Sequence, residues 1–140
     1  MPYLPAALPR FVPGRDDGPW WDALRRHELV IQRCADCGRW RHPPAPLCAS
    51  CRSVAVRWER TSGQGRVFSY TIVHHAVHPA LADHIPYNVA LVELPDADNV
   101  RLISNLVDVP PADIHIGLEV EILFEDLDQE TTLPRFRRGP

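Results

Sequence analysis

The sequence predicts a mainly β protein in which a small metal-binding ribbon precedes an antiparallel β-barrel. Three observations carry this prediction. Four cysteines form two Cys-x2-Cys pairs ten residues apart, apolar and polar residues alternate with period two through most of the chain after residue 54, and helix-start signals occur near residue 18. We expect an extended arm and amphipathic helix over residues 1–30, a zinc ribbon over 31–53 and a barrel over 54–140.

The first 18 residues predict an extended arm. They contain four prolines and two glycines, which disfavour regular structure. They also carry the apolar residues Tyr3, Leu4, Leu8, Phe11 and Val12. So small a domain offers little to cover such a segment, and ordering it costs roughly 1 kcal/mol or more per residue. We therefore expect the arm to lie on a surface or on a partner.

One short helix follows the arm. Asp17 supplies a capping residue, and Pro19 suits the first helical turn. Trp20, Trp21, Ala23 and Leu24 then give an amphipathic pattern up to about residue 28. Two adjacent tryptophans do not fit one small core well, so we expect one of them to face a partner; packing against the ribbon is the alternative.

The two cysteine pairs predict a structural zinc site made of Cys34, Cys37, Cys48 and Cys51. Gly38 follows the first pair, where a tight turn needs a residue without a Cβ. Four thiolates fill a tetrahedral coordination sphere, so a zinc ion held there stabilises the fold and does not catalyse. Iron can occupy the same four sulfurs, and two disulfides are the alternative without a metal.

The second part of the chain alternates in short runs that predict five or six strands of a small barrel of the oligonucleotide/oligosaccharide-binding (OB) type. The clearest run places Leu118, Val120 and Ile122 on one face and glutamates on the other. Residues 110–116 are expected to form the crossover. In an earlier run, Phe68 and Tyr70 are expected to share a face. The expected strands cover residues 54–60, 66–75, 87–94, 100–107, 118–125 and 133–136.

The sequence offers little for catalysis. His74, His75 and His78 invite a second metal site, but in a strand only His74 and His78 share a face, and no acidic residue is close by. We interpret the three histidines as structural or interface residues. The chain has no lysine and no cysteine outside the two pairs, so thiolate and Schiff-base nucleophiles are missing. We expect no catalysis by this chain alone.

Charge and hydropathy narrow the functional classes further. Residues 33–60 hold six arginines, whereas residues 108–130 hold eight acidic residues and no arginine. This asymmetry fits either a solvated surface or a partner of complementary charge. No stretch approaches the roughly 20 apolar residues of a membrane span, and the N-terminus lacks the pattern of a signal peptide. We expect a cytoplasmic protein that does not bind membranes.

Several segments together resemble the rubredoxin-like zinc-ribbon plus OB-fold family of acyl-CoA-associated proteins. The resemblance covers the chain from Trp20 to Phe136. Proteins of this family are non-catalytic companions of thiolase-superfamily enzymes, including steroid side-chain aldolases, or of acyl-CoA hydratases, to which the module is sometimes fused. The segments that carry the resemblance are LVIQRCADC at 29–37, HPP at 42–44, CASC at 48–51, SGQGRVFSYT at 62–71, PYNVALVEL at 86–94 and Gly117.

The resemblance implies an accessory subunit of an acyl-CoA enzyme. The best-fitting partner is a thiolase-like aldolase that cleaves a steroid side-chain CoA thioester by a retro-aldol reaction; a thiolase or a hydratase is the alternative. We expect a heterotetramer with two copies of each chain and an acyl-CoA bound mainly by the partner. The expected partner interface comprises Phe11, Trp20, Trp21, His74, His75 and His78. A CoA phosphate could approach Arg135, Arg137 and Arg138, for which a solvated tail is the alternative.

Binding of single-stranded nucleic acid is the rival class, because zinc ribbons and OB barrels both serve it in other proteins. The net charge of −3 opposes it. The predicted strands also carry few exposed aromatic residues for base stacking, and the basic residues gather around the ribbon. We therefore expect no nucleic-acid partner.

Overall fold

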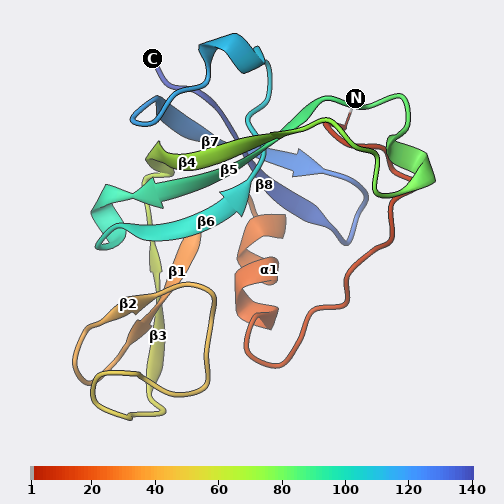
Figure 1. Ribbon diagram of the computed structural model, residues 1–140. Helices are drawn as coiled ribbons and strands as arrows, with labels where there is room; N and C mark the ends of the chain where they lie inside the picture. Colours follow the sequence, from red (N-terminus) through yellow and green to blue (C-terminus); the bar gives the residue numbers. More distant parts are fainter. Residues whose placement is uncertain (1) are drawn as a thin grey trace.

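A computed structural model describes residues 2–140 and shows a mainly β chain with one short α-helix (Figure 1). Three 3-10 turns interrupt the loops, at Pro79–Leu81, Pro95–Ala97 and Pro111–Asp113. Within the described residues, no helix is both long and apolar enough to span a membrane. The regular elements are α1 Gly18–Arg25, β1 Val30–Cys34, β2 Trp40–Arg41, β3 Val56–Arg60, β4 Gln64–Val73, β5 Tyr87–Leu94, β6 Val100–Ser104, β7 Glu119–Asp126 and β8 Thr132–Arg138.

The ribbon is a three-stranded antiparallel sheet in the order β2-β1-β3. Cys34, the last residue of β1, lies opposite Val56 at the start of β3. We expected residues 54–60 to form the first barrel strand, but β3 pairs with β1 along all five of its residues. Period-two alternation identifies a strand and cannot identify its sheet, because partner choice depends on contacts distant in sequence.

The barrel is a five-stranded antiparallel sheet in the order β6-β5-β4-β7-β8, and its two edges meet. Leu106, just after β6, forms a parallel bridge with Phe136 of β8. The Val107 N–H donates to the Phe136 carbonyl at 2.7 Å, and the Phe136 N–H donates to the Asn105 carbonyl at 3.2 Å. These bonds satisfy backbone groups that an open sheet edge would leave unpaired.

A β-bulge in β4 changes which side chains enter the barrel. Val67 lies opposite Val92 and Tyr70 lies opposite Ala90, with a register shift between Val67 and Ser69. Since directly opposed residues share a face, Tyr70 lies on the same face as Val67. Phe68 lies on the outer face, where the Arg101 guanidinium stacks 3.6 Å from its ring centre. The expectation that Phe68 and Tyr70 share a face was wrong.

The helix α1 connects the ribbon to the barrel, and Figure 1 shows it beside β1 and below the larger sheet. Trp20, Ala23 and Leu24 are buried in one apolar cluster with residues from both sheets. This cluster accounts for most of the hydrophobic stabilisation, at about 25 cal/mol per Å² of apolar surface removed from water. Its barrel members include Val67, Ala90, Val92, Leu94, Leu102, Leu106, Leu118, Val120 and Phe136.

The arm lies on the barrel of its own chain. The Tyr3 N–H donates to Glu125 at 2.9 Å, and the Tyr3 hydroxyl accepts from the Asn88 side-chain amide at 2.7 Å. Farther along the arm, the Phe11 ring stacks on Trp21 with 4.0 Å between ring centres. The arm thus lies on a surface, one of the two expected placements, and that surface belongs to its own chain: β5 and β7 hold the arm at Tyr3, and the helix holds it at Phe11.

Candidate metal centre

The four cysteines lie together at the end of the ribbon, and their sulfur atoms are all within 4.8 Å of one another. The Cys34 and Cys51 sulfurs are 3.6 Å apart, as are those of Cys37 and Cys48. A tetrahedral ion with metal–sulfur distances near 2.3 Å places its ligands about 3.8 Å apart, whereas a disulfide needs about 2.05 Å. The arrangement fits one metal ion and does not fit two disulfides.

The two cysteine pairs are built on the same backbone pattern. In the first, the Gly38 N–H donates to the Cys34 carbonyl at 3.0 Å; in the second, the Arg52 N–H donates to the Cys48 carbonyl at 2.9 Å. The residue that follows each pair has a left-handed backbone, with φ of 79° at Gly38 and 64° at Arg52. Sequence reasoning identified the turn at Gly38 and missed Arg52, because a non-glycine residue gives no signal of a positive φ.

Backbone N–H groups favour the thiolate form of two of the four cysteines. The N–H groups of Cys51 and Ser50 lower the pKa of Cys48 to about 6, and the N–H group of Cys37 lowers the pKa of Cys34. The thiolate is the form that binds a metal. The Cys34 and Cys48 sulfurs thus receive part of their charge compensation from the turns that present them.

The Arg33 side chain braces the first turn. Its Nε donates to the Gly38 carbonyl at 2.7 Å, and its guanidinium lies 4.7 Å from the centre of the Trp40 ring. The two turns are also tied together, since the Ser53 hydroxyl donates to Asp36. Because all four ligand positions are thiolates, a bound ion has no open position for water or substrate. The centre can stabilise the ribbon and cannot activate a substrate.

The residues of the predicted partner interface differ in exposure. Trp20 is buried and its ring lies 5.1 Å from that of His42, which connects the helix to the ribbon. Trp21 is partly buried, with its Nε1 donating to Asp17 at 3.0 Å, and Phe11, stacked on it, is 40% exposed. Trp20 therefore packs against the ribbon, which was the alternative to a partner contact. Phe11 and Trp21 remain accessible at the surface.

The three histidines do not gather into a metal site. His74 and His75 are exposed in the segment after β4, whereas the His78 Nδ1 accepts from the Ala80 N–H at 3.1 Å and caps a 3-10 turn. Among the described residues, the four cysteines form the one group of three or more metal-binding side chains. A local structural role for His78 follows from its cap.

The three C-terminal arginines each contact a carboxylate. Arg135 is 8% exposed, and its guanidinium donates to Asn105 and, at 3.5 Å, to Glu125. Arg137 pairs with Glu121 at 2.8 Å and Arg138 with Asp113 at 3.5 Å. Arg137 and Arg138 are exposed, but Arg135 points into the protein beneath the arm. No feature of the sequence indicated that Arg135 is buried, because an arginine in a strand next to a charged tail is normally expected to face solvent.

Two family descriptions match adjoining parts of the chain. Residues 21–57 match the "ChsH2, rubredoxin-like zinc ribbon domain", and residues 58–125 match the "ChsH2, C-terminal OB-fold domain". The boundary between the two matches falls inside β3, the strand that joins the ribbon sheet.

Relatives and a solved structure extend these matches. The chain is 45% identical over 134 residues to a probable enoyl-CoA hydratase alpha subunit of Thermomonospora curvata, covering 95% of this chain and 41% of that protein. It is 40% identical over 123 residues to the 3-oxo-4,17-pregnadiene-20-carboxyl-CoA hydratase alpha subunit of Mycobacterium tuberculosis, covering 87% and 38%. The chain thus spans about two fifths of the length of these two relatives.

A chain in the solved structure "Ltp2-ChsH2(DUF35) aldolase" superposes with a TM-score of 0.83 at 43% identity. The superposition covers 92% of this chain and 98% of that one. The protein belongs to the ChsH2 (DUF35) family of rubredoxin-like zinc ribbon and OB-fold proteins.

Proposed function

We propose that this chain is a non-catalytic accessory subunit of a thiolase-superfamily enzyme that acts on acyl-CoA thioesters, with a steroid side-chain retro-aldolase as the specific partner. The superposition on almost the whole of a chain from an aldolase structure carries this proposal. The closed set of four thiolates supports a structural role for the metal. The reacting groups then belong to the partner, which also binds most of the acyl-CoA.

A hydratase partner is the second candidate, favoured by two relatives that are hydratase alpha subunits. In those proteins the matched region is less than half of a longer chain, so other parts of each protein have room for hydratase groups. The two candidate functions differ in the enzyme that this chain accompanies. In both, the chain itself is a non-catalytic accessory subunit. A panel containing an aldolase, a thiolase and a hydratase from the same organism distinguishes them.

Zinc is the metal that we propose for Cys34, Cys37, Cys48 and Cys51. The family description names a zinc ribbon, and four thiolates at tetrahedral spacing suit zinc as well as iron. Elemental analysis of protein expressed with both metals available decides between them. About one zinc per chain and little iron is the expected result; a coloured protein with one iron would contradict it.

The partner surface that we propose is centred on Phe11 and Trp21, with His74, His75 and His78 at a second position. Phe11 and Trp21 form an aromatic pair at the surface, and aromatic residues contribute strongly to protein interfaces. Trp20 supports this pair from below, since the two tryptophan rings meet edge to face at 4.6 Å. Phe11→Ala with Trp21→Ala removes the pair while leaving Trp20 in the core.

Co-expression with each candidate enzyme, followed by size-exclusion chromatography with light scattering, tests this proposal. We expect a heterotetramer with the aldolase, retro-aldol activity only in the complex, and at least tenfold weaker association for the double variant. Ile116→Ala changes another exposed apolar residue, 70% accessible, and serves as the control. Retro-aldol turnover by the partner-free chain, or a monomer beside every candidate, would overturn the accessory role.

Single-stranded nucleic acid remains the rival ligand to exclude. Phe68 and Tyr70 are the exposed aromatic residues of β4, on opposite faces of the strand, and Arg101 already covers one side of the Phe68 ring. Leu91 and Ile103, which lie opposite each other on β5 and β6, are aliphatic and cannot stack with bases. We expect no salt-dependent binding of a labelled oligonucleotide at micromolar protein.

A further inference from the structure

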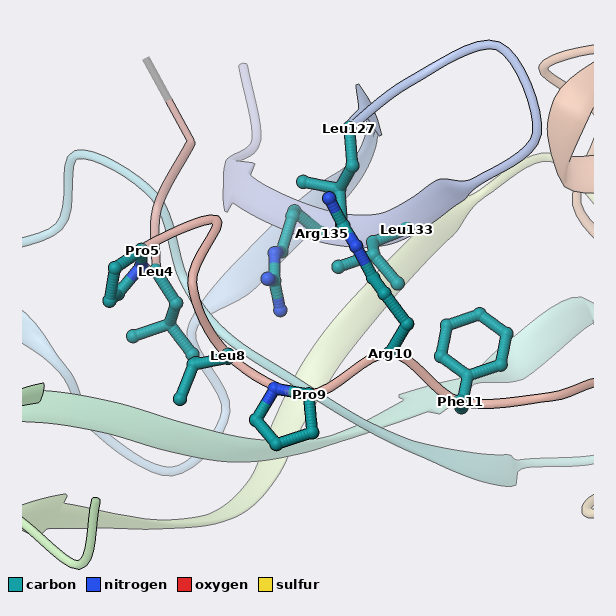
Figure 2. Close-up of a pocket in the computed structure, with 9 residues that line it drawn as sticks. All are labelled: Leu4, Pro5, Leu8, Pro9, Arg10, Phe11, Leu127, Leu133 and Arg135. Atoms are coloured by element: carbon teal, nitrogen blue, oxygen red, sulfur yellow. The ribbon is translucent and has the colours of Figure 1, made fainter. Parts of the chain in front are cut away.

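A small pocket lies between the arm and the barrel. The arm is held at Tyr3 and again at Phe11, and between these points it turns at Pro5, whose carbonyl accepts from the Leu8 N–H at 3.2 Å. Figure 2 shows the side chains of this turn facing those of Leu127, Leu133 and Arg135. Together they line a partly open pocket of about 150 Å³. A buried cavity of that size, lined by apolar side chains, holds a molecule about as large as benzene.

The pocket combines apolar walls with positive charge. Seven of its nine lining residues are leucine, proline or phenylalanine, among them Leu8 and Leu133, and the other two are Arg10 and Arg135. Among the described residues, no acidic residue lines it. The nearest carboxylates contact the arginines from outside the lining and at long distances, 3.5 Å from Glu125 to Arg135 and 3.7 Å from Asp128 to Arg10.

Arg135 has donor capacity that the protein does not use. Its guanidinium carries five N–H groups. The described contacts are one hydrogen bond to Asn105, one long contact to Glu125, and a Tyr3 ring 5.8 Å away. The buried Nε has no partner within the described residues. A buried guanidinium with fewer acceptors than N–H donors destabilises a protein, so an acceptor beside Arg135 in the pocket has an energetic reason to bind.

We propose that this pocket binds a short-chain aliphatic monocarboxylate, such as butanoate, with its carboxylate against Arg135 and Arg10 and its chain against Leu8 and Leu133. Guanidinium groups bind carboxylates through paired, charge-assisted hydrogen bonds. Butanoate has about as many heavy atoms as benzene, which matches the volume. The pocket shares Phe11 with the proposed partner surface, but its test uses the chain alone, so its failure would leave the accessory role untouched.

The test is an NMR titration of the full-length, metal-loaded chain at constant ionic strength, following backbone amides and arginine Nε–H signals. We expect saturable shifts with butanoate and a Kd on the order of 1 mM. Acetate, which lacks two methylenes, should bind about fifteenfold more weakly, because each buried methylene contributes roughly a factor of four. Butanamide, the neutral analogue of butanoate, and inorganic phosphate should shift the Arg135 signal little at the same concentrations.

Two substitutions locate the site. Leu8→Trp fills the pocket from the partly exposed arm and should abolish binding, whereas Leu47→Trp, on an exposed ribbon loop, should not change it. Arg135→Gln should weaken binding at least tenfold; if that variant does not fold, Leu8→Trp decides. Equal binding of acetate and butanoate, equal binding of butanamide, or unchanged binding in Leu8→Trp would each overturn the proposal. An absence of saturation at tens of millimolar would do the same.

Discussion

The ribbon and the barrel are stabilised by different forces. The ribbon buries Val30 and Ile31 on β1, but at its far end the buried residues are Cys34 and Cys48. Several of its apolar residues stay in solvent, including Val54, which is 75% exposed. The barrel instead encloses a continuous set of buried apolar side chains from all five strands and the loops between them. A metal replaces the core where a segment is too short to build one.

The helix links the two regions through a contact near each of its ends. At its start, Trp20 packs against His42 of the ribbon. Just beyond its end, the His27 Nε2 lies 2.9 Å from Asp126 of β7, and the His27 ring stacks on Phe124 at 5.0 Å. The following substitutions act on the ribbon, the barrel and each contact in turn.

Removal of one metal ligand should have the largest effect. Cys48→Ala should lose the bound metal and unfold the ribbon, because metal binding supplies on the order of 10 kcal/mol to folding in comparable zinc modules. Amide NMR signals of residues 31–57 should collapse while those of β4–β8 persist. The control variant Ala49→Ser, which lies between Cys48 and Cys51, should keep the metal. Simultaneous loss of all signals would show that ribbon and barrel fold as one unit.

Truncation of the barrel core should come next. Phe136 is fully buried at the point where the barrel closes, so Phe136→Ala should lower the free energy of unfolding by about 3–5 kcal/mol. Urea unfolding followed by circular dichroism measures this. Phe11→Ala, at a 40% exposed position, should cost about 1 kcal/mol or less. Loss of the metal in folded Phe136→Ala would contradict the separation of the two regions.

His42 should make the contact between helix and ribbon sensitive to pH. Burial lowers its pKa from 6.5 to about 4, so the unfolded chain binds a proton more readily than the folded one between these values. The contribution of neutral His42 to stability is therefore complete above pH 6.5. It is lost as the pH is lowered through this window, by about 2 kcal/mol between pH 7 and 5.

His42→Phe provides the comparison, because protonation of the metal ligands affects both proteins and cancels in the difference. The free energy of unfolding of the variant should fall by about 2 kcal/mol less than that of the original chain over this pH range. Identical pH slopes for the two proteins would show that His42 is not held neutral against Trp20.

The contact between helix and barrel should matter least. The Thr132 hydroxyl and His27 lower the pKa of Asp126, so its contribution is present above the ordinary value near 3.8 and disappears as pH falls through the lower folded value. The pair is about half exposed, and Asp126→Asn should cost less than about 1 kcal/mol at pH 7. Asp16→Asn, at an exposed position, is the control; a loss above about 2 kcal/mol would assign this contact a larger role.

Local signals in the sequence located most elements of this fold. The spacing of the four cysteines predicted their convergence, because a Cys-x2-Cys turn orients both sulfurs within four residues. The expected strand at 87–94 coincides with β5, whose burial alternates strictly along its length. The expected helix began within one residue of α1, since a capping residue and a proline fix a start by local backbone geometry.

Other features depended on contacts between distant residues, which leave no local pattern. The bulge at Phe68 and the pairing of β3 with β1 depend on neighbours far away in the sequence. Arg135 is buried because an arm more than 120 residues away in sequence folds back over it. The sequence by itself determined most of the strands after residue 54 and where a metal can bind. Only the tertiary structure decided which side chains those segments enclose, because burial depends on the whole packed arrangement.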